Sequence, residues 1–167
     1  MRLTTKEYTR VSKRSAKWRE SNDCTVKALA IATKSTYEKA HGALALRGRS
    51  FGKGVHMNEV WKALGDLGFE AETVFNRFDI ERAERWPAAE YPGMSGVEKE
   101  ANKWRRSRWA KAKTIKSVAG YLPQRGVFLI ETSAHVLCVR AGQVHDWTDG
   151  RRHRITKVHR IIRRKQK

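Results

Sequence analysis

Apolar residues recur at helical spacing in the N-terminal part of the chain, and they gather in short runs toward its C-terminus. The first clear helix is predicted to begin at Cys24, where Asn22 or Asp23 can cap it. Its apolar face contains Val26, Leu29, Ala30 and Thr33. Two more helices are expected at residues 36–44, capped by Ser35, and at residues 59–67, capped by Asn58 and closed by Gly68.

Strand signals begin at residues 69–75 and return in the C-terminal part of the chain. Residues 126–140 are rich in β-branched and aromatic side chains, which predicts two strands with a break near residues 132–134. Ala141-Gly142 is typical of a tight turn, and residues 143–147 then form the returning strand. A last strand is expected at residues 154–161. Together these elements predict an α+β fold with helices packed on an antiparallel sheet.

Two segments fit this pattern less directly. Residues 48–54 form a Gly-rich basic loop that lacks the Gly-Lys-Ser/Thr ending of a P-loop, so we interpret them as a flexible lip near a cleft. Residues 76–113 contain prolines and glycines, followed by a basic helix at residues 97–113. In that helix Trp104 and Arg108 are four residues apart. Basic residues interleaved with tryptophan can clamp phosphates and stack bases, but the pattern fits equally well a tryptophan that anchors the helix to the body.

Charge is concentrated in three segments. The 167-residue chain has a formal net charge of +19. Residues 1–20 contain seven Lys/Arg and two acids, residues 99–113 seven and one, and residues 151–167 nine and none, so the remaining residues are close to neutral. Such segments are suited to a polyanion, with nucleic acid the first expectation and an acidic protein surface the second. The expected contact residues are Lys103, Trp104, Arg105, Arg106, Arg108, Trp109, Arg151, Arg152, Arg154, Arg163 and Arg164.

Composition also limits the setting in which the protein acts. The length predicts one domain, at residues 21–160, with a basic arm at 1–20, a basic helical insertion at about 76–113 and a basic tail at 161–167. Two cysteines without framework spacing indicate a reducing compartment. No apolar leader or membrane span is evident, and Ile155 and Ile161 are too sparse for membrane insertion. We therefore expect a cytoplasmic protein, or one carried in a virion assembly.

Catalytic chemistry is suggested by Cys24, His135 and Asp146. A thiol in the first turn of a helix lies where N–H groups and the helix dipole favour the thiolate. With a two-residue turn at 141–142, His135 and Asp146 lie on one face of the hairpin as diagonal neighbours, the arrangement that holds a catalytic imidazole in one tautomer. A three-residue turn would shift the register and place Asp149 opposite His135 instead.

Other interpretations of these residues are structural or metal-binding. Cys138, on the opposite face of its strand, is expected to be a core residue. A zinc site would need Cys24, Cys138, His135 and His145 to converge, but the chain has no Cys-x-x-Cys pair and the strand faces diverge. We therefore expect no metal and no cofactor.

Four segments of the chain resemble those of the papain-like cysteine peptidase superfamily. They are the Asn-Asp-Cys helix start, the Gly-Val-Phe-Leu-Ile strand, the Ala-His-Val-Leu-Cys-Val strand and the Val-His-Asp-Trp segment. The likeness is to small phage and bacterial members related to double-glycine leader peptidases, and it covers roughly residues 20–75 and 114–160. It implies a papain-like fold with Cys24, His135 and Asp146 as the catalytic residues. Relatives usually carry Gln or Asn a few residues before the cysteine. Here Trp18 stands six residues before it, so Asn22 or Ser21 is left as the oxyanion donor.

The expected function is a phage- or bacterium-encoded cysteine hydrolase, a peptidase or amidase, that forms an acyl-enzyme on a peptide or protein substrate. Two rivals keep the fold without the chemistry. One is a non-catalytic virion or nucleic-acid-binding protein, which the absent upstream glutamine favours. The other is an inhibitor that places its basic surface in the acidic site of a host enzyme.

Overall fold

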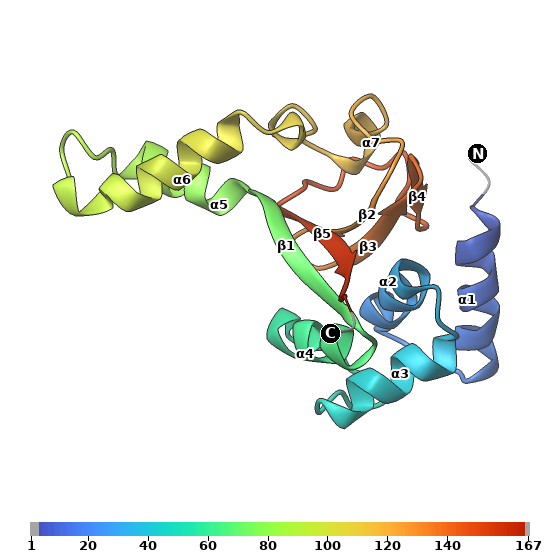
Figure 1. Cartoon of the computed structure of the whole chain (residues 1–167). Coiled ribbons are helices and arrows are strands. Elements are labelled where there is room, and N and C mark those ends of the chain that lie inside the picture. The colour runs from blue at the N-terminus through green and yellow to red at the C-terminus, as the bar shows by residue number, and fades with distance from the viewer. Residues whose placement is uncertain (1–3, 166–167) are drawn as a thin grey trace.

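The computed structural model describes residues 4–165 and has the predicted α+β architecture (Figure 1). Within these residues, one antiparallel sheet has the strand order β1-β5-β2-β3-β4. The strands are β1 Phe69–Asn76, β2 Val127–Glu131, β3 Val136–Arg140, β4 Gln143–His145 and β5 Lys157–Arg163. The α-helices are α1 Lys6–Lys17, α2 Cys24–Thr33, α3 Tyr37–Leu46, α4 Met57–Asp66, α5 Arg77–Arg85, α6 Ser95–Arg105 and α7 Ile115–Val118. Two 3-10 helices are η1 Pro92–Met94 and η2 Arg108–Ala110.

Apolar side chains cover both faces of the sheet, which explains the unbroken apolar runs of β2 and β3. On one face, Leu129 and Cys138 pack in a cluster with Val26 and Leu29 of α2. On the other face, Ile130 belongs to a second cluster with apolar residues of α5, α6, η2 and α7. Burial of this apolar surface is the main favourable term in folding. Because α2 packs directly on β2 and β3, its N-terminus is held against the sheet.

The N-terminal segment is part of the domain, contrary to the prediction of a basic arm. Helix α1 packs against α2 and α3 and buries Tyr8 and Val11 in the same cluster as α2 (Figure 1). Its basic residues occupy the remaining, exposed or half-exposed positions of the helix. Tyr8 and Val11 are three residues apart, which is a helical spacing, so this basic segment has a face that can be buried. Residues 1–3 lie outside the described residues.

The C-terminal segment is likewise structural over most of its length. The predicted strand at 154–161 begins and ends later, as β5. This strand lies between β1 and β2 in the sheet, so residues 161–163 of the predicted tail are inside the fold. Its buried apolar side chains lie on both faces, with Val158 in the second cluster and Ile161 in the cluster that contains α2, while Arg160 and Arg163 are exposed. Residues 166 and 167 lie outside the described part of the chain.

The predicted basic helix at 97–113 is wrong in its length. Helix α6 ends at Arg105, and Ser107 caps the following 3-10 helix by accepting a hydrogen bond from the Trp109 N–H. Ser107 therefore interrupts the helix, and Trp104 and Arg108 do not share a helical face. Helices α5 and α6 pack on each other and project from the sheet (Figure 1).

Several helix starts also differ from the prediction by one or two residues. Thr36, not Ser35, caps α3 by accepting a hydrogen bond from the Lys39 N–H. His56, not Asn58, occupies the cap position of α4. By contrast, the strand predicted at 69–75 is present as β1. Thr114 caps α7. No helix in residues 4–165 is long and apolar enough to cross a membrane.

Candidate active site

Cys24 is the first residue of α2, as its sequence context predicts. Asp23 occupies the cap position, but its carboxylate accepts hydrogen bonds from the Tyr37 hydroxyl at 2.7 Å and pairs with Lys27 at 3.0 Å instead of capping the helix. The first turn of α2 therefore has no side-chain cap. Because the helix dipole and unbonded N–H groups favour negative charge at this end, the position suits a thiolate at Cys24.

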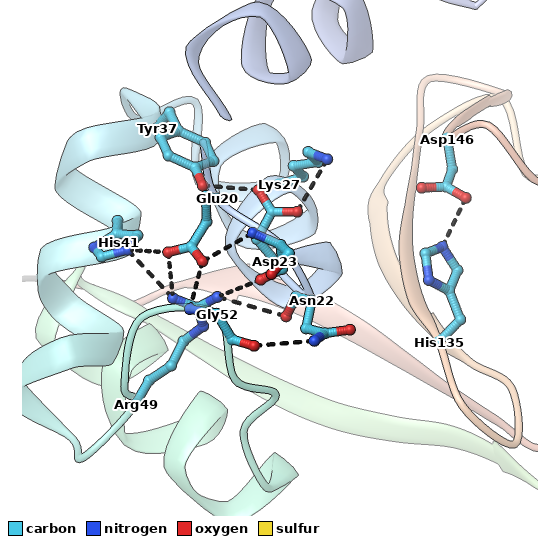
Figure 2. A network of polar contacts seen from close by, with 11 residues as sticks. Glu20, Asn22, Asp23, Lys27, Tyr37, His41, Arg49, Gly52, His135 and Asp146 are labelled. Atoms are coloured by element: carbon cyan, nitrogen blue, oxygen red, sulfur yellow. Dashed lines mark hydrogen bonds and ion pairs between the residues drawn. The ribbon is translucent and has the colours of Figure 1, made fainter. Parts of the chain in front are cut away.

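The segment that leads into Cys24 is held by a buried carboxylate, Glu20 (Figure 2). Its side chain and that of Arg49 are both completely buried, and the two are 3.1 Å apart. Glu20 also contacts His41 Nε2 at 2.7 Å and accepts hydrogen bonds from the N–H groups of Ser21 and Gly52. Burial alone would raise the pKa of Glu20, but hydrogen bonds from Arg49, His41 and these backbone groups lower it to about 2.

Arg49 connects the same carboxylate to the backbone just before Cys24. Its guanidinium donates to the carbonyl oxygens of Ser21 and Asn22 at 3.4 and 3.5 Å. Asn22 has a φ of 51°, in the left-handed region, and its side-chain amide donates to the Gly52 carbonyl at 2.9 Å. The loop at 48–54 is thus bound to the segment before Cys24, which agrees with its predicted place beside the site (Figure 2).

The oxyanion role of Asn22 stays a prediction, and one of the two N–H donors of its side-chain amide is bonded to Gly52. The backbone N–H of Cys24 itself has no hydrogen-bond partner in residues 4–165. It is the donor that the first turn of α2 offers to a developing oxyanion.

His135 and Asp146 form the expected pair. His135 Nε2 lies 2.8 Å from Asp146 Oδ2, with the two side chains 14% and 5% exposed (Figure 2). The same carboxylate oxygen accepts hydrogen bonds from the N–H and hydroxyl of Thr148 at 3.0 and 2.6 Å. His135 is itself held by the N–H of Thr132, which donates to its carbonyl oxygen. Both members of the pair are therefore fixed by neighbouring backbone.

The hairpin register that brings them together is the predicted one. Arg140 pairs with Gln143 across a two-residue turn in which Ala141 and Gly142 both have positive φ, 49° and 74°. Positive φ at both central residues is the type I′ geometry, whose twist matches that of paired strands. With this turn, Asp146 contacts the imidazole.

Cys24 and His135 perturb each other's protonation. Burial disfavours the Cys24 thiolate, but a hydrogen bond from His135, with N–H groups of Val136 and Thr25, lowers the pKa of the thiol overall. Burial likewise disfavours a charged His135, yet hydrogen bonds to Asp146 and Cys24 raise its pKa to about 9. Each shift favours the charged form of its group, the thiolate of Cys24 and the imidazolium of His135.

Cys138 behaves as the predicted core residue. It is fully buried opposite His145, and burial raises the pKa of its thiol to about 12. His145 is bonded to Thr5 and points into a different environment from His135. Residues 4–165 contain no group of His, Cys, Asp and Glu side chains arranged to hold a metal ion.

Sequence reasoning missed the residues around the pair. Trp147 directly follows Asp146, and its ring lies 5.5 Å from the His135 ring while 45% of the residue is exposed. Because Trp147 is next to Asp146 in the sequence, its place near the His135–Asp146 pair could have been predicted. Glu20 and Arg49 carried no such signal, because their contact joins residues 29 positions apart.

The residues expected to bind a polyanion are distributed over several surfaces. Arg108 and Trp109 line one pocket, Lys103 and Arg106 a second. The C-terminal residues divide between a third pocket, lined by Arg163 and Arg164, and a fourth, lined by Arg151 and Arg152. Arg154 pairs with Glu81 and Arg105 with Glu84.

Of the two interpretations of Trp104, the structure supports the anchor and not the residue that stacks on bases, since Trp104 is buried between α5 and α6. Only 6% of this residue is exposed, and its indole N–H donates to Asp79 at 3.0 Å. Trp109 is 3% exposed and packs on Phe128 with 5.3 Å between ring centroids. Both tryptophans are therefore anchors, although one edge of Trp109 lines a pocket.

The chain matches no protein-family model, and comparisons with curated proteins and with solved structures gave no match.

Proposed function

We propose that this protein is a papain-like cysteine hydrolase that cleaves an amide or ester bond of a peptide or protein substrate through an acyl-enzyme. The observation that carries the proposal is the His135–Asp146 hydrogen bond of 2.8 Å together with the hydrogen bond between His135 and Cys24, the residue that begins α2. A nucleophile with a lowered pKa, a base and a group that orients the base are the parts that such catalysis requires. The proposal requires no cofactor.

In the first half of the reaction, the Cys24 thiolate attacks the carbonyl carbon of the substrate. The new S–C bond places negative charge on the carbonyl oxygen, which the Cys24 N–H and the dipole of α2 stabilise. The C–N or C–O bond then breaks as the imidazolium of His135 gives its proton to the leaving group. A thioester remains on Cys24.

In the second half, neutral His135 takes a proton from water as the water oxygen attacks the thioester. The S–C bond breaks, the acid is released, and thiolate and imidazolium are restored. Asp146 keeps the imidazole in one orientation throughout, because its carboxylate is fixed by two hydrogen bonds from Thr148. Glu20 and Arg49 act one step further away by holding the backbone that leads into Cys24.

A binding protein with an unused triad is the alternative, and Trp18 in place of an upstream glutamine favours it. A p-nitrophenyl ester separates the two functions, because the hydrolase gives a stoichiometric burst of nitrophenolate and an acyl group on the Cys24 peptide in the mass spectrum. Cys24→Ala should lose both signals, and Cys138→Ala, which removes the buried thiol, should keep them. Acylation spread over lysines with no burst would contradict the hydrolase.

A further inference from the structure

A pocket of about 590 Å³ combines an apolar floor with a basic rim. The floor includes Trp109 and Phe128, and the rim includes Arg108, Arg125 and Arg160. No acidic side chain lines this pocket within the described part of the chain. Its volume falls within the range of ligand sites, which are concave and mostly apolar with a few convergent polar groups.

The three arginines of the rim are exposed, and their side chains form no hydrogen bond or ion pair within residues 4–165. Some arginines elsewhere in the chain, among them Arg47 and Arg49, are paired with carboxylates. A cluster of unpaired guanidinium groups raises the local positive potential and leaves planar donors that match phosphate oxygens.

One acidic residue lies near this rim. Glu72 is the cross-strand neighbour of Arg160 in the pairing of β1 with β5, although the two side chains form no ion pair in the described structure. The negative charge of Glu72 therefore repels an anion at Arg160, while the N–H groups of Arg160 stay available to that anion. This makes Glu72 a sensitive position for testing the charge of the ligand.

The pocket lies on the opposite face of the sheet from α2. Phe128 pairs with Arg160 in the β2–β5 register, so their side chains share a face. The adjacent Leu129 points to the other face, where it packs in the cluster that contains α2. A ligand in the pocket is thus separated by the sheet from Cys24 at the start of α2.

We propose that this pocket binds one nucleotide unit of a single-stranded nucleic acid, with the base against the apolar floor and the flanking phosphates on the arginine rim. A duplex keeps its bases inside, whereas a single strand can place a base in the hollow. The exposed Arg106 and Lys111 flank η2 in the sequence, close to the pocket residues Arg108 and Trp109. A polymer, which has further phosphates, uses these residues, whereas a mononucleotide does not.

Fluorescence anisotropy of a labelled oligothymidylate, titrated with the full chain, tests this proposal. Arg125→Ala/Arg160→Ala should bind at least about tenfold more weakly than the wild type, because two charge-assisted contacts are lost. Its slope of log affinity against log salt should be smaller by about 1.4, since each single-strand phosphate contact contributes about 0.7.

Matched variants separate this site from general charge. Lys13→Ala/Lys17→Ala removes the same charge from α1 and should leave the affinity within about twofold of wild type. Glu72→Gln should tighten binding. Cys24→Ala should bind normally, because the proposal is independent of the hydrolase function. Circular dichroism and thermal unfolding establish that each variant is folded.

Three results would overturn the proposal. The first is an equal loss of oligothymidylate affinity in Arg125→Ala/Arg160→Ala and in Lys13→Ala/Lys17→Ala, or no loss of affinity in Arg125→Ala/Arg160→Ala. The second is displacement of the oligonucleotide by thymidine monophosphate at the same nucleotide concentration, which would identify a free nucleotide as the occupant. The third is equal or tighter binding of polyglutamate, which would identify an acidic protein.

Discussion

Replacing Glu20 with glutamine should cost the protein about 3 kcal/mol of its free energy of unfolding at pH 7. The pKa of Glu20 is lowered from 4.5 to about 2 by its hydrogen bonds in the fold. Each unit of pKa corresponds to 1.36 kcal/mol, so the folded state favours the carboxylate by about 3 kcal/mol. Breaking a buried ion pair from one side has a similar cost of about 3–5 kcal/mol, because Arg49 would remain charged and unpaired.

The sign of the pH dependence follows from the lowered pKa. The contribution of Glu20 is fully present above its unfolded pKa of about 4.5 and disappears as the pH falls toward 2. Urea unfolding of the wild type should therefore show a loss of stability between these pH values. Other carboxylates titrate in the same range, so the difference between wild type and Glu20→Gln isolates the contribution of Glu20.

Asp66→Asn provides the control, because it breaks an exposed ion pair with Arg47. Exposed pairs contribute little to stability, so its urea midpoint should stay near that of the wild type. If Glu20→Gln unfolds at the wild-type midpoint, or loses stability in acid as steeply as the wild type does, the buried network does not hold the segment before Cys24 in the way inferred here.

Further predictions concern the catalytic pair and the sheet. His135→Ala should abolish the nitrophenolate burst, whereas Asp146→Ala should slow it by about 100-fold, because orienting a base contributes less than supplying one; an equal loss in both variants would contradict these roles. Deleting residues 157–167 should prevent folding, measured by circular dichroism, because it removes the interior strand β5. Arg163→Gln, which removes charge and keeps the strand, should remain folded, and a folded deletion variant would contradict the sheet order.

The fold class and the hairpin register could be predicted because they depend on neighbouring residues. The tight turn at Ala141 and Gly142 determines which residue of one strand faces which residue of the next, so the contact of His135 with Asp146 followed from local geometry. Similarly, the apolar spacing after Cys24 was sufficient to place the start of α2.

The structural role of the basic segments could not be predicted from their charge, because exposed basic side chains are equally compatible with a free tail and with a packed helix or strand. Strand β5 buries Val158 on one face of the sheet and Ile161 on the other, with the exposed Arg160 between them in the sequence, so a basic segment forms an interior strand. Its partners, β1 and β2, are distant in sequence. Only the assembled sheet shows that this segment lies between two other strands.

The buried network before Cys24 was missed for a related reason. Glu20, His41 and Arg49 come from different elements, and each resembles an ordinary surface residue in the sequence. In the fold these side chains are largely buried, and a buried charge without a partner is costly. Each of the three residues therefore needs the other two beside it. No local pattern encodes that requirement.

The central claim is that Cys24 is an activated thiolate, and its rate of alkylation as a function of pH tests this most directly. Iodoacetamide labelling of the Cys24 peptide, followed by mass spectrometry, should give an apparent pKa clearly below that of an ordinary thiol. His135→Ala should move that pKa upward, and Cys138, whose pKa burial raises to about 12, should stay unlabelled until the protein is unfolded. Slow labelling of Cys24 with an ordinary thiol pKa, unchanged by His135→Ala, would contradict the account.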